Sequence, residues 1–178
     1  EVAGDVLEIG SNVDNLSVGD RVMTSTRVGG YAEAIVAPAQ STRIIPPTLS
    51  YDAAAALPAA YNTAYVSLVR RGALQPGETL LVHGATGGVG LAAVEMGKLL
   101  GATVIATGGT DEKLEVVKTK GADHVFNYTR DDGTQGGFRE FVKELTDGRG
   151  ADVIYDPVGG DVFDESIRCI AWGGRLLV

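Results

Sequence analysis

Eight consecutive residues, 83–90, have the types and spacing that bind a phosphate group. They read His-Gly-Ala-Thr-Gly-Gly-Val-Gly, which is a dinucleotide-binding pattern with alanine at its first position. Gly87 would let the backbone approach a pyrophosphate, and Gly90 would let the following helix pack closely on the preceding strand. The alternative is a tight turn with a purely structural role. The cofactor contacts expected in this loop are Ala85, Gly87, Gly88, Val89 and Gly90.

Apolar strands alternate with helices around this loop. The strands are continuous apolar runs, which is typical of a parallel sheet covered on both faces. The sequence therefore predicts an α/β fold with a doubly wound parallel sheet, and the loop opens its first helix. We expect strands at 79–83, 103–107, 125–127, 153–155 and 175–178, and helices at 89–100, 112–120, 138–145 and 163–170.

The first 45 residues read instead as β structure without a helix. Short runs bounded by Gly, Asn, Asp and Pro indicate about four strands, at 4–9, 21–23, 31–37 and 42–45. Beyond them, Asp52 is expected to cap a short helix, and Pro58 to begin a second one. These signals place a β domain at 1–45 and a dinucleotide-binding domain, with its leading helices, at 46–178.

Composition excludes several classes of protein. The 178 residues hold 25 glycines, one cysteine and a formal net charge of −8. One cysteine forms neither an internal disulfide nor a thiolate metal cage. The acidic balance argues against a nucleic-acid partner, and no apolar run reaches the roughly 20 residues of a membrane span. Because the sequence lacks an initiator Met and stops within an apolar strand, we expect it to be part of a longer protein.

The end of the second expected strand indicates which dinucleotide binds. NAD enzymes place an acid there for the ribose 2′-hydroxyl, whereas this chain has Gly108 and Gly109. Asp111 follows, as a helix cap or first-turn residue. A neutral strand end leaves room for a 2′-phosphate, and Lys113 is the nearest cation. Solvation of a helix face is the alternative role for that lysine.

Several motifs together resemble the medium-chain dehydrogenase/reductase superfamily, in its zinc-free, zeta-crystallin-like quinone oxidoreductase branch. The similarity covers nearly the whole chain and implies that residues 1–45 are part of a GroES-like domain. It also implies a parent protein of roughly twice this length. The motifs, besides the glycine loop, are Val18-Gly19-Asp20-Arg21-Val22, Gly29-Gly30-Tyr31-Ala32-Glu33, Ala55-Ala56-Leu57-Pro58, Thr63-Ala64-Tyr65, Gly121-Ala122-Asp123 and Asp156-Pro157-Val158-Gly159-Gly160.

The resemblance implies a reaction without zinc. Zinc-dependent members carry four cysteines in the segment that matches 23–28, where this chain has none, and a metal ligand at the position of Ala59. We therefore expect no metal, and direct hydride transfer from NADPH to a quinone or an α,β-unsaturated carbonyl. Close alternatives are reduction of an enoyl- or acryloyl-CoA thioester, and a non-catalytic, crystallin-like NADPH-binding protein.

Further site residues come from the same resemblance. Asn62 and Thr63 are expected beside the nicotinamide and substrate, with helix N-terminal hydrogen bonding as the alternative. Lys113 and Tyr128 match positions that bind the 2′-phosphate. Val158 and Gly159 follow the fourth strand, at the carboxyl edge where ligands bind. Gly108 completes the expected cofactor contacts.

The expected partners are small molecules. The resemblance implies a homodimer for the full-length protein, and we expect neither a nucleic-acid nor a membrane partner. The expected location is the cytoplasm. Because family members draw further site residues from segments outside this sequence, we expect the 178 residues alone to lack oxidoreductase activity.

Overall fold

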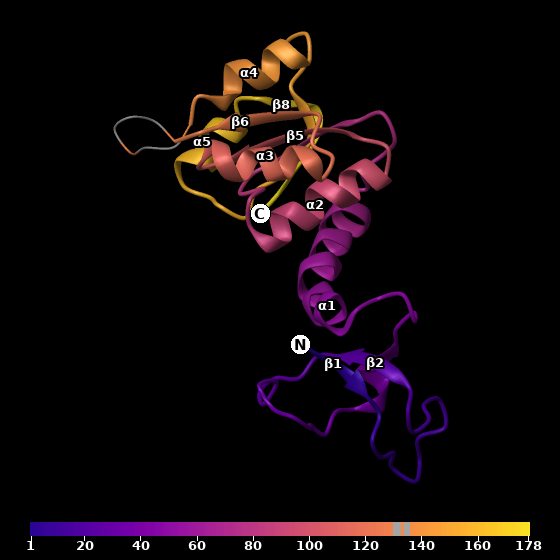
Figure 1. Ribbon diagram of the computed structural model, residues 1–178. Coiled ribbons are helices and arrows are strands. Elements are labelled where there is room, and N and C mark those ends of the chain that lie inside the picture. The colour runs from indigo at the N-terminus through magenta and orange to yellow at the C-terminus, as the bar shows by residue number, and fades with distance from the viewer. Residues whose placement is uncertain (130–132, 134–135) are drawn as a thin grey trace. The chain divides into compact units, whose positions relative to one another are not determined.

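The chain divides into two compact units, Glu1–Ala59 and Ala60–Val178. The computed structural model describes residues 1–129, 133 and 136–178. Figure 1 shows the path of the chain through both units. The expected boundary after residue 45 lies at the end of the N-terminal strands, whereas the division between the compact units falls inside a helix, α1 (Tyr51–Tyr65).

The first unit holds a small antiparallel sheet in the order β1-β2-β3. The guanidinium of Arg21 fastens this sheet to the chain leading into α1, because it donates to the carbonyl oxygens of Pro46, Pro47 and Leu49 at 2.7–3.1 Å. The elements are β1 (Val2–Asp5), β2 (Arg21–Thr24), a 3₁₀ turn (Ala39–Ser41) and β3 (Arg43–Ile44).

The strand expected at 31–37 is wrong. This segment is irregular, and Tyr31 and Val36 are fully exposed. Alternation of apolar residues favours a strand only where a neighbouring strand supplies hydrogen bonds and a face to bury. Residues 1–45 thus form three short strands and not a GroES-like domain.

Helix α1 is continuous where two helices were expected. Ser50 caps it, since its Oγ accepts from the N–H of Ala53 at 3.2 Å, and Asp52 lies in the first turn. Pro58 lies inside the helix and is buried. The alanine-rich turn before it has the highest helix propensity, which offsets the lost backbone hydrogen bond. A π-helical segment, Val66–Arg71, follows α1.

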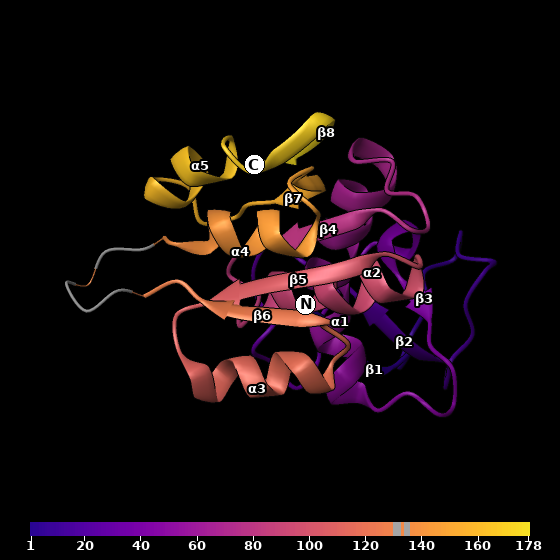
Figure 2. The same ribbon diagram turned by 90° about the horizontal axis from the view of Figure 1, so that it is seen from above.

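The second unit is a five-stranded sheet in the order β6-β5-β4-β7-β8, and every pair in it is parallel. Figure 2 shows the strands side by side, with α4 in front of the sheet and α2 behind it. The elements are β4 (Thr79–Val82), α2 (Gly88–Leu99), β5 (Thr103–Gly108), α3 (Asp111–Thr119), β6 (His124–Asn127), α4 (Phe138–Leu145), β7 (Ala151–Tyr155), α5 (Asp161–Ser166) and β8 (Ile170–Leu177).

Both faces of this sheet are buried, which confirms the doubly wound fold. Leu80 and Val82 of β4 pack with α2 and α3 on one face. Leu81, between them, packs with Phe138 and Val142 of α4 on the other face. Because successive side chains of a strand point to opposite faces, a strand covered on both sides must be apolar at every position.

The last helix is shorter than expected. Ile170 begins β8 instead of ending a helix, and Cys169 lies in the turn between α5 and β8, fully buried. Gly173 has φ +76°, and a Cβ on Gly174 would lie 2.6 Å from Cγ1 of Ile170 and 2.9 Å from the carbonyl oxygen of Ala171, so the irregular start of β8 hides its strand character in the sequence. Among the described residues, no helix is both long and apolar enough to cross a bilayer.

Arg175 fastens β8 to the start of β4. Its guanidinium makes a forked ion pair with Glu78 at 2.7 and 2.8 Å, and its Nε donates to the carbonyl of Gly72 at 2.8 Å. This pair lowers the pKa of Glu78.

We expect Arg175→Ala to lower the free energy of unfolding by about 2 kcal/mol, because a forked, half-buried pair is lost. Denaturant titration checks this. Arg175→Lys should recover only part of the loss, since an ammonium cannot form the fork, and full recovery would contradict the proposed geometry.

Candidate functional site: the carboxyl edge of the parallel sheet

The glycine loop lies where the order of the sheet reverses. It follows β4, the middle strand. The next two strands, β5 and β6, lie on one side of β4, and the last two, β7 and β8, lie on the other side. In doubly wound folds, ligands bind outside the carboxyl ends of the strands at this switch point. The loop is anchored to both neighbours, because the N–H of Ala85 donates to Thr107 at 2.9 Å and that of His83 to Tyr155 at 2.9 Å.

The glycines of the loop divide into closed and open positions. A Cβ on Gly90 would lie 2.3 Å from the carbonyl oxygen of Gly84 and 2.8 Å from the Cα of Ala85, so α2 contacts the loop backbone directly. A Cβ on Gly88 would meet nothing within 4 Å, and one on Gly87 only a carbonyl at 3.5 Å. The exposed surface at Gly87 and Gly88 is therefore free for an anion at the N-terminus of α2.

The end of β5 is also tightly packed and neutral. A Cβ on Gly108 would lie 2.7 Å from Thr86 and 3.0 Å from Leu114. The first acid after it, Asp111, accepts from the side-chain amide of Asn127 at 2.9 Å. Lys113, in the first turn of α3, is exposed and makes no ion pair within the described part of the chain. This edge thus offers a free cation, while its nearest carboxylate is already engaged.

Tyr128, which the resemblance matched to a 2′-phosphate position, directly follows β6 and is buried. Its side chain is 6% exposed and packs with Phe138 and Ile154 on the α4 side of the sheet. Burial, and next to it the charge of Asp156, raises the pKa of the Tyr128 phenol. Tyr128 is therefore buried, whereas Lys113 is exposed.

Asn62 and Thr63 lie in the C-terminal half of α1. Both are exposed, whereas Ala64 beside them is fully buried in the core of the second unit. The alternative role in helix N-terminal hydrogen bonding is wrong, because α1 begins at Tyr51. Both polar side chains are free to meet a ligand from solvent.

Val158 and Gly159 stand directly beside the glycine loop. A Cβ on Gly84, which has φ +57°, would lie 3.1 Å from Cγ2 of Val158. Asp156 turns the chain there, since its Oδ1 accepts from the N–H groups of Val158 and Gly159 at 3.0 and 2.9 Å. The Asp156 side chain is nearly completely buried, at 1% exposure.

His83, the first residue of the glycine loop, is held in place by buried contacts. It is fully buried against Phe138, and burial lowers its pKa to about 4. Its Nε2 lies 2.9 Å from Ser166 Oγ, which itself donates to Val162 at 2.7 Å, and its Nδ1 lies 2.7 Å from Thr107 Oγ1. Ser166 therefore accepts from Nε2–H, and Thr107 donates to Nδ1 of a neutral ring. This arrangement is structural and leaves neither nitrogen free for a metal.

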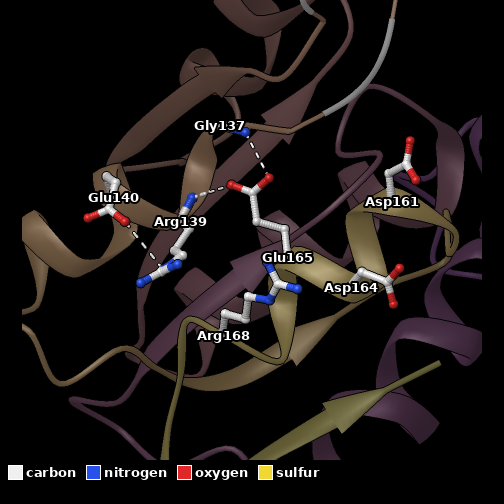
Figure 3. A pocket seen from close by; sticks show the side chains of 7 residues that line it. All are labelled: Gly137, Arg139, Glu140, Asp161, Asp164, Glu165 and Arg168. Atoms are coloured by element: carbon white, nitrogen blue, oxygen red, sulfur yellow. Dashed lines mark hydrogen bonds and ion pairs between the residues drawn. The ribbon is translucent and has the colours of Figure 1, made fainter.

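A polar hollow of about 290 Å³ lies between the start of α4 and α5. Figure 3 shows Glu165 at its centre, reaching across to α4. Its carboxylate accepts from the N–H groups of Gly137 and Arg139 at 2.8 Å each, so it caps α4 from a neighbouring helix. The central carboxylate of the hollow is therefore engaged in capping α4. The glycine loop and its surroundings remain the better candidate site.

The described residues offer no cluster of three or more side chains suited to a metal ion. Cys169 is buried, and burial raises its pKa to about 12, which keeps the thiol protonated. A thiol in that state is a poor zinc ligand, because zinc binds the thiolate.

Comparison with known proteins agrees with this geometry. A family model described as zinc-binding dehydrogenase matches residues 88–178. A quinone oxidoreductase-like protein 2 homolog of Nematostella vectensis is 45% identical, over 99% of this chain and 47% of its own length. The chain thus spans about half the length of the curated relatives it matches.

Solved structures share the fold closely. Escherichia coli quinone oxidoreductase complexed with NADPH has a TM-score of 0.87 and 35% identity, covering 98% of this chain and 52% of that one. CurK enoyl reductase has a TM-score of 0.87 and 31% identity, covering 98% and 51%. Taken with the glycine loop at the switch point of a doubly wound sheet, these matches show that the chain belongs to the zinc-binding dehydrogenase family of the medium-chain dehydrogenase/reductase superfamily.

Proposed function

We propose that the protein is an NADPH-dependent oxidoreductase that transfers a hydride to a quinone or an α,β-unsaturated carbonyl. The observation that carries this proposal is the glycine loop at the switch point, with open positions at Gly87 and Gly88 and a closed one at Gly90. Quinone oxidoreductase-like relatives support the reaction class.

The residues of the carboxyl edge fit NADPH. The N-terminus of α2 would hold the pyrophosphate, and the neutral end of β5 at Gly108 sets no carboxylate against a 2′-phosphate beside Lys113. Bound NADPH would supply the hydride from its nicotinamide ring, and a proton from solvent would complete the reduced acceptor. The NADPH held by the E. coli neighbour supports this choice of cofactor.

Asn62 and Thr63 are proposed to face the reacting groups. Their exposed amide and hydroxyl would hold the nicotinamide carboxamide or polarise the acceptor carbonyl. The role of this chain is then to orient and to desolvate, since the cofactor carries the chemistry.

We propose that no zinc takes part. The family name implies zinc, but the described residues do not fit it. The segment 23–28 has no cysteine, Ala59 has no donor atom, and Cys169 is buried and protonated. Homodimer formation and a cytoplasmic location are proposed for the full-length protein as well.

Reduction of an enoyl thioester is the second candidate. It is favoured by the similarity to CurK enoyl reductase. A CoA substrate would need a basic surface for its diphosphate, and Arg70 and Arg71 are exposed at the end of the π-helical segment. The guanidinium of Arg70 lies over the ring of Tyr65 at 5.9 Å, so that it is partly engaged already.

NADPH oxidation by the full-length protein tests these proposals. 1,4-Benzoquinone, a simple enone and an enoyl-CoA are compared as acceptors at equal concentration. Oxidation with quinone or enone supports the first proposal, and a marked preference for enoyl-CoA supports the second. NADPH binding without oxidation of any acceptor would leave only the non-catalytic binding protein.

Lys113→Ala tests the 2′-phosphate contact. We expect the dissociation constant for NADPH to rise about tenfold, because one exposed charge pair with a phosphate dianion is lost, while NADH binding is unchanged. Lys118→Ala on the same helix is the matched control, since Lys118 is already paired with Glu115. Titration of both nucleotides by calorimetry measures the effect, and an equal loss for NADPH and NADH would refute the assignment.

A further inference from the structure

Asp156 is a buried carboxylate that the proposed chemistry leaves without a role. It directly follows β7, and its N–H donates to the carbonyl of Leu177 in β8 at 2.8 Å. Aspartate is almost never fully buried unless it is paired, yet this one makes no ion pair within the described part of the chain. Its position at the switch point makes that burial worth explaining.

One oxygen of the carboxylate shapes the loop that follows. Oδ1 accepts from Val158 and Gly159, which closes a turn on the aspartate side chain. Gly159 and Gly160 then take φ values of +74° and +60°, before α5 begins at Asp161. The direction of the chain after β7 is therefore set by Asp156 together with two glycines.

Val158 and Gly159 of that loop form a wall beside the glycine loop. Cγ2 of Val158 would be 3.1 Å from a Cβ on Gly84, so the two loops are in contact where the paired strands β7 and β4 end. Val158 is itself 39% exposed, and its free side faces solvent. The position of Val158 therefore decides how much space is open beside the glycine loop.

The other oxygen, Oδ2, is buried without a hydrogen-bond partner among the described residues. Leaving such an atom unpaired lowers the stability of the folded protein. Its charge acts on two buried neighbours, since Asp156 raises the pKa of Tyr128 and partly opposes the lowering by burial of the pKa of His83. A side chain kept at this cost points to a function at the site rather than to stability alone.

We propose that Asp156 is a positioning residue of the cofactor site, which holds the Val158–Gly159 wall and so orients the nicotinamide half of NADPH. This inference rests on the proposed function. A dinucleotide spans the switch point with one half on either side. The β5 side, with Gly108 and Lys113, takes the adenosine half, and the β7 side therefore takes the nicotinamide half.

The two halves can be tested separately. NADPH and adenosine 2′,5′-bisphosphate, which carries only the adenosine half, are titrated into the full-length protein by calorimetry. We expect Asp156→Ala to raise the dissociation constant for NADPH about tenfold, because both hydrogen bonds to the wall are lost, and to leave binding of the bisphosphate unchanged. Asp156→Asn should restore NADPH binding, since its carbonyl oxygen accepts from the same two N–H groups.

Every other outcome overturns the inference. Equal weakening of both ligands, no weakening of either, or failure of Asp156→Asn to restore binding would each do so. If Asp156→Ala does not fold, Val158→Ala trims the wall without touching the buried carboxylate, and it must show the same selective loss of NADPH binding. A wild-type protein that binds neither ligand would instead overturn the proposed function.

Discussion

Gly90→Ala is expected to lower the free energy of unfolding by about 3 kcal/mol and to weaken NADPH binding at least about tenfold. The new Cβ would meet the carbonyl oxygen of Gly84 at 2.3 Å and the backbone of Ala85 at 2.8 Å. Backbone atoms cannot rotate away as a side chain can, so α2 must move off the loop. The N–H groups at the start of α2 would then miss the pyrophosphate.

Gly88→Ala is the matched control, two residues earlier in the same loop. Its Cβ would meet nothing within 4 Å, and the residue begins α2. We expect this variant to be slightly more stable than wild type, by about 0.5 kcal/mol, because alanine loses less backbone entropy in a helix. Denaturant titrations of both variants measure the contrast, and equal stability of the two would contradict the close contact at Gly90.

The second large effect is a loss of stability in mild acid. The folded protein keeps His83 neutral with a pKa of about 4, whereas the unfolded chain takes up the proton near pH 6.5. The stabilisation by the neutral ring is complete above pH 6.5 and is lost as the pH falls towards 4. The difference between the folded and unfolded pKa values of His83 corresponds to about 3 kcal/mol of unfolding free energy.

Unfolding titrations between pH 7 and pH 4 measure this loss. His83→Gln keeps one donor and one acceptor for Ser166 and Thr107 but cannot take up a proton, so its stability should change far less over this range. The other histidine, His124 at the start of β6, provides His124→Gln as the control, which should retain the wild-type slope. A slope that survives in His83→Gln would refute the assignment to His83.

Local patterns in the sequence predicted much of the second unit. The strands from 79 to 155 were predicted because a strand buried on both faces must be apolar throughout, as Leu80, Leu81 and Val82 are. The glycine loop was predicted because backbone contact with a helix, as at Gly90, tolerates no side chain. Both signals are local, because each is visible in a short stretch of consecutive residues.

Errors arose where the outcome depended on distant partners. The alternation at 31–37 indicated a strand, but pairing decides whether a strand forms, and this segment is irregular. Pro58 marked the start of a helix, yet the turns before it were stable enough to continue through it. Ile170 fitted a helical stripe, although β7 lies beside it as a ready parallel partner.

By itself, the sequence determined the doubly wound unit and the glycine loop of this dehydrogenase-family chain. Periodicity and glycine spacing are properties of neighbouring residues, so they can be read along the chain. Only the tertiary structure decided that Tyr128 is buried, that His83 is a neutral support for the loop, and that Asp156 holds the wall opposite Gly84. Burial and hydrogen-bond partners arise from segments far apart in the sequence, which meet only when the strands assemble at one edge of the sheet.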